Sequence, residues 1–382
     1  MVTSSCFFPG YSERTIARRT LEGISLLIVP VDYSNSMGFR ARVRAFLRFA
    51  MKATWIACRE RADVVLATST PLTVAIPAIA ARLLRGTPVV FEVRDLWPDL
   101  PIAMGVLRNP IWRAGARVLE RMAYLTASHV VALSPGMADE IRKRGVPRER
   151  LHVIPNSCDL ELFDVPAEHG QEIRTRLGLR DGQPLLTYAG TFGRINGVTY
   201  LVELAAALRR LQSDVHVLLV GNGAERVRVR QRAMELGVLG DNLTMWEPVE
   251  KQEMPRVLAA STLCASVFLP IPAMENNSAN KFFDALAAGR PIAINYGGWQ
   301  AELVNRNGIG VVLPPDDVED AAKRIIRFLA DPANVSSAGR AARELARSRF
   351  DRAMLSRQLE SVLVAAASSR GSSEDGRSGP RR

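Results

Sequence analysis

Cysteine, histidine and aromatic residues are scarce in this sequence, and their scarcity excludes several classes of protein. The 382 residues include four cysteines and four histidines, and Phe, Trp and Tyr together make up 6%. The cysteines, at positions 6, 58, 158 and 264, lack the paired spacing of a zinc site or a disulfide framework. The histidines form no metal-binding pattern either. We therefore expect a reduced, cytoplasmic protein with no metal site and no cofactor.

The sequence also offers no secretory leader and no long membrane-spanning run. The opening residues, MVTSSCFFPGYSERT, do not combine a basic start with a long apolar stretch. The most apolar segment, VVLATSTPLTVAIPAIAARLL at 64–84, contains two prolines and four hydroxyl residues. Because its first part is β-branched, the pattern predicts a strand, a loop and then a helix rather than a membrane-spanning helix.

Positive charge, by contrast, is abundant. The chain has 50 basic and 39 acidic residues and a formal net charge of +11. Such an excess favours a partner of opposite sign, namely nucleic acid, an anionic membrane face or a phosphorylated substrate. Because no aromatic-basic platform or helix-turn-helix pattern accompanies the charge, we do not expect a nucleic-acid partner. The 47% hydrophobic content is that of a globular chain, and the length favours two domains.

A short β-branched strand, a loop of small residues and a helical pattern recur along the chain. In HVVALSPGMADEIRKRG, Ser134 can cap a helix that has Pro135 at its first position. Runs such as VHVLLV are apolar enough to be buried on both faces. This alternation predicts an α/β fold with two doubly wound, Rossmann-like domains of parallel strands. We place the domains at 1–165 and 166–345, a C-terminal helix at 346–367 and a disordered tail at 368–382.

Three loops of the second half follow predicted strands, at the sheet edge where α/β folds bind their ligands. The first, GTFGRING, offers the backbone of Gly190 to an anion, with Arg194 as a full charge. The second, GNGAER, supplies Gly221 and Gly223 as the first two glycines of a dinucleotide fingerprint, but has Arg226 in the third position. Either loop, taken alone, can also be a turn without a ligand.

The third loop lies in ENNSANKFFDALAAGRPI and is rich in asparagine. It opens an apolar helix in which only Lys281 and Asp284 are charged, and their spacing of three places them on nearly the same side. One interpretation is an exposed ion pair, which stabilises little. In the other, the helix N-terminus and Lys281 suit a diphosphate, Asp284 suits the two hydroxyls of a ribose, and the amides suit a sugar. A nucleotide-sugar is the ligand that would use all three loops.

Two features of the first half suggest other roles. Asp95 ends the strand FEVRD, where it can orient a hydroxyl, act in proton transfer or cap the next helix. Residues 39–61 show a helical pattern with one basic side. That side consists of Arg40, Arg44, Arg48, Lys52 and Arg59. It is either the solvated face of a core helix or a contact for anionic lipid headgroups.

These features together resemble one known family. The segments RDLWPDLPIAMGVL, VVALSPGMADEIRKRGVPRERLHVIPNSCDLELF, YAGTFGRINGV and NKFFDALAAGRPI occur in the order typical of family 4 glycosyltransferases with the GT-B fold. The branch that they resemble builds bacterial surface polysaccharides and includes N-acetylfucosaminyl transferases. The resemblance covers nearly all of the chain before the tail, and it implies two Rossmann-like domains that face a cleft.

The resemblance implies a retaining, metal-independent transferase of the hexosyl or N-acetylhexosaminyl type. Its donor would be a nucleoside-diphosphate sugar, UDP-linked in our interpretation, and its acceptor a lipid-linked or growing surface glycan. The expected catalytic residues are Asp95, Lys281 and Arg194, of which the two cations would stabilise the leaving diphosphate. The expected donor-binding residues are Gly190, Gly193, Asn196, Gly221, Gly223, Asn276, Asn277, Asn280, Lys281 and Asp284.

The sequence departs from the family pattern at several positions. Thr191 and Asn196 stand where the family has Arg and Lys, and Asn276 and Asp284 stand where it has a pair of glutamates. Arg94 occupies the place of a common histidine. Relative to the family, the chain starts near the second strand, so we expect its N-terminal domain to lack the first β-α unit and the Gly-rich acceptor loop. Asp284 can still hold a ribose, so the departures affect sugar contact more than nucleotide binding.

Other functions fit parts of the same pattern. GNGAER can serve an NAD-dependent oxidoreductase, although no acid follows at the ribose spacing. A chain without the acceptor loop can also bind nucleotide and transfer nothing, as a catalytically inactive homologue, and an epimerase can use the same fold. In each case we expect a cytoplasmic location, with peripheral attachment to the inner face of the cell membrane as a further interpretation of the basic helix.

Overall fold

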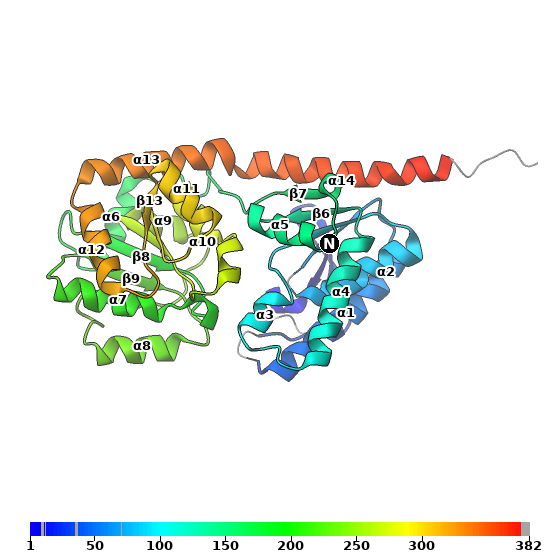
Figure 1. Ribbon diagram of the computed structural model, residues 1–382, viewed down its shortest axis with the longest axis horizontal. Helices are drawn as coiled ribbons and strands as arrows, with labels where there is room; N and C mark the ends of the chain where they lie inside the picture. The colour runs from blue at the N-terminus through cyan, green and yellow to red at the C-terminus, as the bar shows by residue number, and fades with distance from the viewer. Residues whose placement is uncertain (9–10, 12, 35–36, 70, 376–382) are drawn as a thin grey trace, which may run out of the picture. The chain divides into compact units, whose positions relative to one another are not determined.

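The computed structural model describes residues 1–382 except 9–10, 12, 35–36, 70 and 376–382 (Figure 1). Its contacts divide the chain into two compact units. Unit 1 is Met1–Ile154 together with the segment that starts at Gln358, and unit 2 is Pro155–Arg357. The boundary predicted between 165 and 166 lies further along the chain than this division. The reason is that the PNSCD segment (155–159) is hydrogen-bonded to unit 2, where the Cys158 thiol donates to the Phe283 carbonyl at 3.2 Å.

Unit 2 is built on a parallel sheet with the strand order β10-β9-β8-β11-β12-β13. Its strands are β8 (Leu185–Ala189), β9 (His216–Val220), β10 (Leu243–Trp246), β11 (Leu263–Ser266), β12 (Ile292–Ile294) and β13 (Gly310–Val312). Along β9, Val217 and Leu219 pack into one hydrophobic core and Leu218 and Val220 into another, so both faces of the sheet are buried. The chain order reverses between β8 and β11, and such a reversal opens a crevice at the carboxyl ends of the strands.

Helices cover both faces of this sheet (Figure 1). They are α6 (Ala167–Arg176), α7 (Thr199–Arg210), α8 (Arg226–Glu235), α9 (Met254–Ala260), α10 (Asn280–Ala287), α11 (Trp299–Asn307), α12 (Val318–Leu329) and α13 (Pro332–Arg349). Helices α7 and α12 pack together, as do α6 and α9 and also α10 and α13. The doubly wound α/β arrangement predicted for the second half is therefore confirmed.

The described residues of unit 1 form two sheets rather than one. The first has the order β1-β3-β2, with β1 (Val2–Ser4) parallel and β2 (Ala17–Leu21) antiparallel to β3 (Ile24–Val29). The second is the parallel sheet β4-β5-β6-β7. Its strands are β4 (Val65–Thr68), β5 (Val89–Val93), β6 (His129–Ala132) and β7 (Leu151–Val153). At the start of the chain, Val2 lies opposite Leu27 and Ser4 opposite Val29 of β3.

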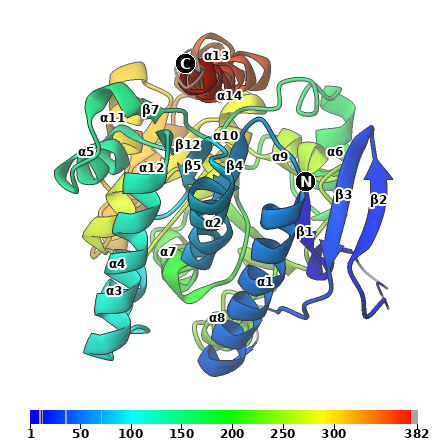
Figure 2. The same cartoon turned by 90° about the vertical axis from the view of Figure 1, so that its right-hand side faces the viewer.

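Three helices of unit 1 lie side by side, α2 (Ala75–Arg85) between α1 (Phe39–Arg59) and α4 (Pro110–Thr126) (Figure 2). The apolar segment 64–84 is β4, a short 3-10 turn and most of α2, as predicted. Within the described residues, no helix has both the length and the apolar character needed to cross a bilayer. Unit 1 also contains two short helices, α3 (Asp99–Ala103) and α5 (Pro135–Lys143). Ser134 caps α5 by accepting from the Met137 N–H at 3.1 Å, as expected.

The end of the chain differs from the prediction of one helix at 346–367 and a disordered tail. Helix α13 ends at Arg349, and α14 (Arg352–Asp375) follows after two residues. The break arises because Cys158 takes over backbone groups at this point, donating to the Phe350 carbonyl at 2.7 Å and accepting from the Arg352 N–H at 3.1 Å. Helix α14 includes 368–375 of the predicted tail, and the rest of that tail lies outside the described residues.

Candidate functional site

A cavity of about 640 Å³ opens at the carboxyl ends of β8 and β11, where the strand order of unit 2 reverses. All residues that line it belong to unit 2. Its polar and charged lining includes Asn156, Asp159, Thr191, Lys251, Asn280, Lys281, Asp284 and Arg352. Apolar walls come from side chains such as Phe163 and Phe268. A concave site at a topological switch point with a few convergent charges is the usual place for a ligand in an α/β sheet.

The first two glycine loops, predicted separately, touch one another in the structure. The Phe192 N–H donates to the Asn222 carbonyl at 2.9 Å, and the Gly190 N–H donates to the Val220 carbonyl at 3.0 Å. A Cβ atom on Gly221 would lie 1.9 Å from the Gly190 oxygen, and one on Gly223 would lie 2.6 Å from the Phe192 oxygen. Both glycines also have positive φ, +145° and +155°. They are needed because the two backbones approach so closely.

Arg226, which breaks the dinucleotide fingerprint, holds the second loop in place. At the start of α8 its guanidinium donates to the Trp246 carbonyl at 3.0 Å and also to the Gly221 carbonyl. It forms an ion pair with Glu247 at 2.7 Å. These contacts account for an arginine at this position as a clamp on the loop. A smaller cavity of about 240 Å³ lies beside the first loop and is lined by Gly190, Gly221 and their neighbours.

Lys281 projects from the first turn of α10 toward the first glycine loop. Its Nζ lies 4.5 Å from the ring centre of Phe268 and 5.2 Å from that of Tyr188. With the amide of Asn196 turned to suit its neighbours, Asn196 accepts from Lys281 Nζ at 3.2 Å and donates to the Thr191 carbonyl at 3.1 Å. Burial lowers the pKa of Lys281 to about 8. The amine therefore carries its charge at pH 7 at a cost that an anionic ligand would relieve.

Asp284 lies one turn further along α10 and lines the same cavity. Burial raises the pKa of its carboxyl to about 6, against the opposing effect of Lys251 and with a further increase from Asp159. Within the described part of the chain, its carboxylate forms no hydrogen bond or ion pair with another residue, Lys281 included. The exposed ion pair that we considered as the alternative is therefore not what the structure contains. Both charged groups of α10 face the cavity.

The asparagine-rich loop contributes unequally. Asn280 lines the cavity, whereas the Asn277 side chain shapes the loop by donating to the Met274 carbonyl and accepting from the Ala279 N–H at 3.0 Å. Asn276 is half-buried and, in the described structure, is not among the residues that line the cavity. Among the described residues Ala279 holds the N-cap position of α10, and no side chain caps the helix there. Its first turn thus keeps N–H groups for an anion.

Two predicted catalytic residues are not among the described residues that line this cavity. Arg194 is exposed in a 3-10 turn, and the described lining of the cavity does not include it. Gly193, just before this turn, packs against Asn196. Asp95 follows β5 in unit 1, where the neighbouring Arg94 N–H donates to the Ser69 hydroxyl at 3.1 Å. The catalytic roles of Asp95 and Arg194 remain predictions.

Several residues of the cavity lining had not been predicted as site residues, and Asn156, Asp159, Lys251 and Arg352 are four polar ones among them. Asn156 donates through its backbone N–H to the Ser278 hydroxyl at 3.3 Å, and Arg352 pairs with Asp159 at 2.6 Å. Lys251, which lies in the loop before α9, is the fourth of these residues. The polar run PNSCD had been placed in the first domain, ahead of the predicted boundary at 165, so its contribution to the cavity was missed. Among the described residues, no three His, Cys, Asp or Glu side chains are grouped closely enough to hold a metal ion.

Comparison with known proteins gives matches along most of the chain. The family model for a glycosyl transferase 4-like domain matches residues 4–157, and that for glycosyl transferases group 1 matches residues 170–345. Alpha-D-kanosaminyltransferase of Streptomyces kanamyceticus is 25% identical over 67% of this chain and 64% of its own length. The 2-deoxystreptamine glucosyltransferase of the same organism is 25% identical over 59% and 57%. The chain thus matches less than two thirds of the length of these two relatives.

Another relative matches over more of its length, and solved structures are similar to this chain as well. The probable glycosyltransferase WbjE of Pseudomonas aeruginosa is 24% identical over 78% of this chain and 73% of its own. Anabaena HepE, crystallised with UDP-glucose, superimposes with a TM-score of 0.69 at 19% identity, covering 90% of this chain and 86% of that one. WaaG, a glycosyltransferase involved in lipopolysaccharide biosynthesis, gives 0.67 at 16% identity over 90% and 88%. The chain therefore belongs to the family 4 glycosyltransferases, and its fold is GT-B.

Proposed function

We propose that this protein transfers a sugar from a UDP-linked donor to a lipid-linked or growing surface glycan. The observation that carries the proposal is the cavity of unit 2, where the Lys281 amine and the Asp284 carboxylate face one space at a sheet switch point. HepE, whose complex contains UDP-glucose, supports the choice of UDP, and WaaG, involved in lipopolysaccharide biosynthesis, supports a glycan acceptor. The residue types in the cavity suit a nucleoside diphosphate.

In this proposal the diphosphate lies between the first glycine loop and the start of α10. Lys281 supplies positive charge, and the uncapped first turn of α10 supplies backbone N–H groups. The Asp284 carboxylate accepts hydrogen bonds from the two hydroxyls of the ribose. The apolar side chains of the cavity exclude water, which strengthens each of these electrostatic contacts.

In this proposal, breaking the bond between the sugar and the diphosphate creates negative charge, and Lys281 is placed to stabilise that charge. As the glycosidic bond to the diphosphate breaks, negative charge grows on the leaving phosphate oxygens. A cation already buried beside them needs no rearrangement at that moment. For the retaining, metal-independent course that we propose, the departing phosphate accepts the acceptor proton on the same face. Asp95 would orient the acceptor hydroxyl, and Arg194 would add to the positive charge that stabilises the leaving diphosphate.

Thermal shift against UDP, GDP, TDP and NAD tests the proposed ligand. A nucleotide at 100 times its dissociation constant adds about 2.7 kcal/mol of stability, which corresponds to a rise of about 5–10 °C for a unit of this size. We expect UDP to raise the melting temperature of the wild type and of Lys323→Ala, a control substitution at an exposed lysine on α12. We expect no such rise in Lys281→Ala. A shift with NAD alone would instead favour the oxidoreductase. No shift with any nucleotide would contradict the proposed donor site.

A further inference from the structure

Helix α4 of unit 1 turns an apolar stripe outward. The stripe consists of Ile111, Val118, Met122 and Leu125, whose spacing of seven, four and three residues places them on one side of the helix. Ile111 is 79% exposed, Val118 59% and Leu125 53%. Trp112, at 58%, lies on the shoulder of the same helix. A surface helix normally places such residues against the core, so this α4 stripe has the pattern of a binding surface.

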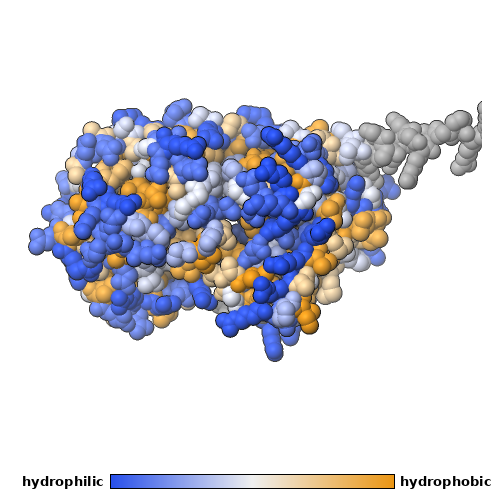
Figure 3. All heavy atoms as spheres, viewed as in Figure 1, coloured by the Kyte–Doolittle hydropathy of each residue, from blue (hydrophilic) through white to orange (hydrophobic). Residues whose placement is uncertain are grey.

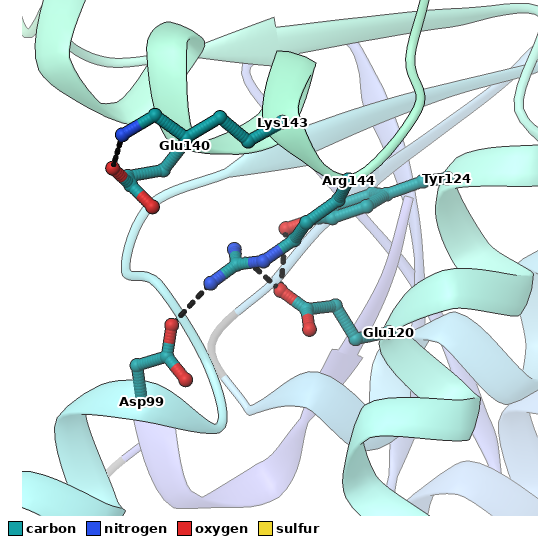
Figure 4. Close-up of polar contacts among 6 residues, drawn as sticks. All are labelled: Asp99, Glu120, Tyr124, Glu140, Lys143 and Arg144. Atoms are coloured by element: carbon teal, nitrogen blue, oxygen red, sulfur yellow. Dashed lines mark hydrogen bonds and ion pairs between the residues drawn. The ribbon is translucent and has the colours of Figure 1, made fainter.

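The opposite side of α4 is fixed to the unit by polar contacts (Figure 4). Glu120 is only 4% exposed and pairs with Arg144 of the α5 C-cap at 2.8 Å. The Tyr124 hydroxyl donates to the Glu120 carboxylate at 3.1 Å, and Asp99 also pairs with Arg144. These interactions hold a charged residue inside and leave the apolar stripe outside. The outward orientation of the stripe is therefore built into the packing.

Helix α1 presents a related face. Its exposed side combines Leu47, Met51 and Trp55 with the predicted basic residues Arg40, Arg44, Arg48 and Arg59. The Arg59 guanidinium stacks over the Trp55 ring at 4.0 Å. Lys52 was predicted to join this basic side but does not, because its Nζ donates to the Pro30 carbonyl at 3.1 Å. The exposed side of α1 is thus both apolar and basic, as in helices that lie in a membrane interface.

The two helices belong to one layer, in which α2 packs against both (Figure 2). In the space-filling view, hydrophobic and hydrophilic spheres are interleaved over the region of α1, α2 and α4 (Figure 3). The three helices contain eleven basic residues and a single acidic one, Glu120, which is buried. The chain as a whole has 39 acidic residues to 50 basic ones. The helix layer is therefore far more basic than the rest of the protein.

We propose that this face of unit 1, formed by the α4 stripe and the exposed side of α1, docks onto an anionic lipid bilayer. Arg117 and Arg121 are exposed on the flank of the α4 stripe, where they can contact lipid headgroups while the apolar side chains enter the interface. Nucleic acid would match the charge but not the aliphatic stripe. This docking face lies on unit 1, and lipid binding there is independent of the proposed transfer reaction.

Flotation of the full chain with vesicles tests this proposal. We expect binding to mixed phosphatidylcholine–phosphatidylglycerol vesicles and little binding to phosphatidylcholine alone. Because each arginine near an anionic surface contributes about fivefold, Arg117→Glu/Arg121→Glu should lower partitioning at least about 25-fold. Ile111→Gln/Val118→Gln/Met122→Gln should lower it at least about tenfold, since the apolar area no longer enters the interface.

Matched controls come from α8 of unit 2, which also carries exposed apolar and basic residues. Val227→Gln/Met234→Gln and Arg228→Glu/Arg230→Glu make changes of the same kind there and should leave vesicle binding unchanged. Circular dichroism melts should show the α4 variants folded, because the altered side chains are exposed. Quenching of tryptophan fluorescence by lipids brominated on their acyl chains should fall in Trp55→Phe/Trp112→Phe.

Three results would overturn the proposal. The first is equal binding of the wild type and the α4 triple variant to the anionic vesicles. The second is equal binding to zwitterionic and anionic vesicles. The third is a wild-type dimer in sedimentation velocity that the α4 triple variant loses while neither protein binds vesicles, which would assign the stripe to a protein partner. UDP-induced thermal shift, measured on the same samples, reports separately on the donor site of unit 2.

Discussion

Each unit of this protein contains a pair of buried or partly buried charged groups, and the two pairs are arranged in opposite ways. In unit 1, Glu120 and Arg144 are joined to each other at 2.8 Å and to Tyr124 and Asp99. In unit 2, Lys281 and Asp284 form no ion pair within the described residues and both line a cavity. A buried charge that the fold pairs serves the fold. One that the fold leaves beside a cavity is available to a ligand.

The pKa values express the same difference. Burial raises the pKa of Glu120 to about 7 although Arg144 opposes the shift, and the carboxylate stays next to its cation. Burial lowers the pKa of Lys281 to about 8, and no carboxylate within hydrogen-bonding distance among the described residues offsets it. The first group has its counter-charge in the chain. The second would receive it from a diphosphate.

Removing one partner of the closed pair should have the largest effect on stability. Arg144→Met leaves Glu120 buried without its cation, which typically costs about 3–5 kcal/mol. We expect this loss in the free energy of unfolding of unit 1 at pH 8, measured by urea titration. It should shrink at pH 5, where the Glu120 carboxyl takes up a proton in the folded protein and no charge is left uncompensated.

Arg142→Met is the matched control for that measurement. Arg142 lies on the same helix and pairs with Asp139 at 3.1 Å, but both side chains are exposed. Such a pair contributes about 0–1 kcal/mol. An equal loss of stability in both variants would mean that the Glu120 pair is no more important than a surface pair.

Removing one member of the open pair should affect catalysis instead. Lys281→Ala should cost about 3 kcal/mol of transition-state stabilisation, by analogy with the loss of one oxyanion donor. We expect kcat to fall on the order of 100-fold with the donor identified by thermal shift, while the melting temperature of the free protein stays equal or rises. Turnover near that of the Lys323→Ala control would remove Lys281 from the reaction.

Asp284 should show a smaller and more selective effect. If its carboxylate accepts from the ribose hydroxyls, Asp284→Ala should weaken UDP binding about tenfold, in line with one or two hydrogen bonds to a charged group. Calorimetry with UDP and 2′-deoxy-UDP gives the test. The wild type should prefer UDP, and the variant should bind the two almost equally. A preference retained in the variant would place the ribose elsewhere.

The smallest effect concerns pH. Below pH 8 the Lys281 amine is charged and attracts the diphosphate, and above pH 8 the free protein loses that proton. UDP affinity should therefore decline as the pH rises through about 8, by less than tenfold per pH unit. Lys281→Arg keeps its charge in this range, so its affinity should stay flat. A wild-type affinity that is constant from pH 7 to 9 would contradict a role for this amine.

How much of this the sequence predicts depends on the range of the interaction. Alternating strands and helices, the Ser134 cap and the segment 64–84 follow from local patterns, and all three are found. The i,i+3 spacing of Lys281 and Asp284 likewise placed both on one side of α10. Contacts distant in sequence were not predictable. The break before α14 depends on Cys158, and the role of Arg226 depends on the carbonyl of Trp246.

The site itself was predicted in part for the same reason. Gly190, Asn280, Lys281 and Asp284 lie on two segments whose local pattern was visible, and all four line the cavity. Lys251 and Arg352 come from segments without a recognisable pattern and meet the cavity only through the tertiary fold. Asn277 carried the right chemistry, but its side chain is used to shape the loop. Composition alone does not distinguish an amide that contacts a ligand from one that holds a loop in shape.

A crystal structure of the full chain with UDP tests the central claim most directly. We expect the diphosphate within hydrogen-bonding distance of Lys281 Nζ at the start of α10, and the ribose hydroxyls on the Asp284 carboxylate. Nucleotide bound away from both residues, for example on the Gly221–Gly223 loop alone, would contradict it.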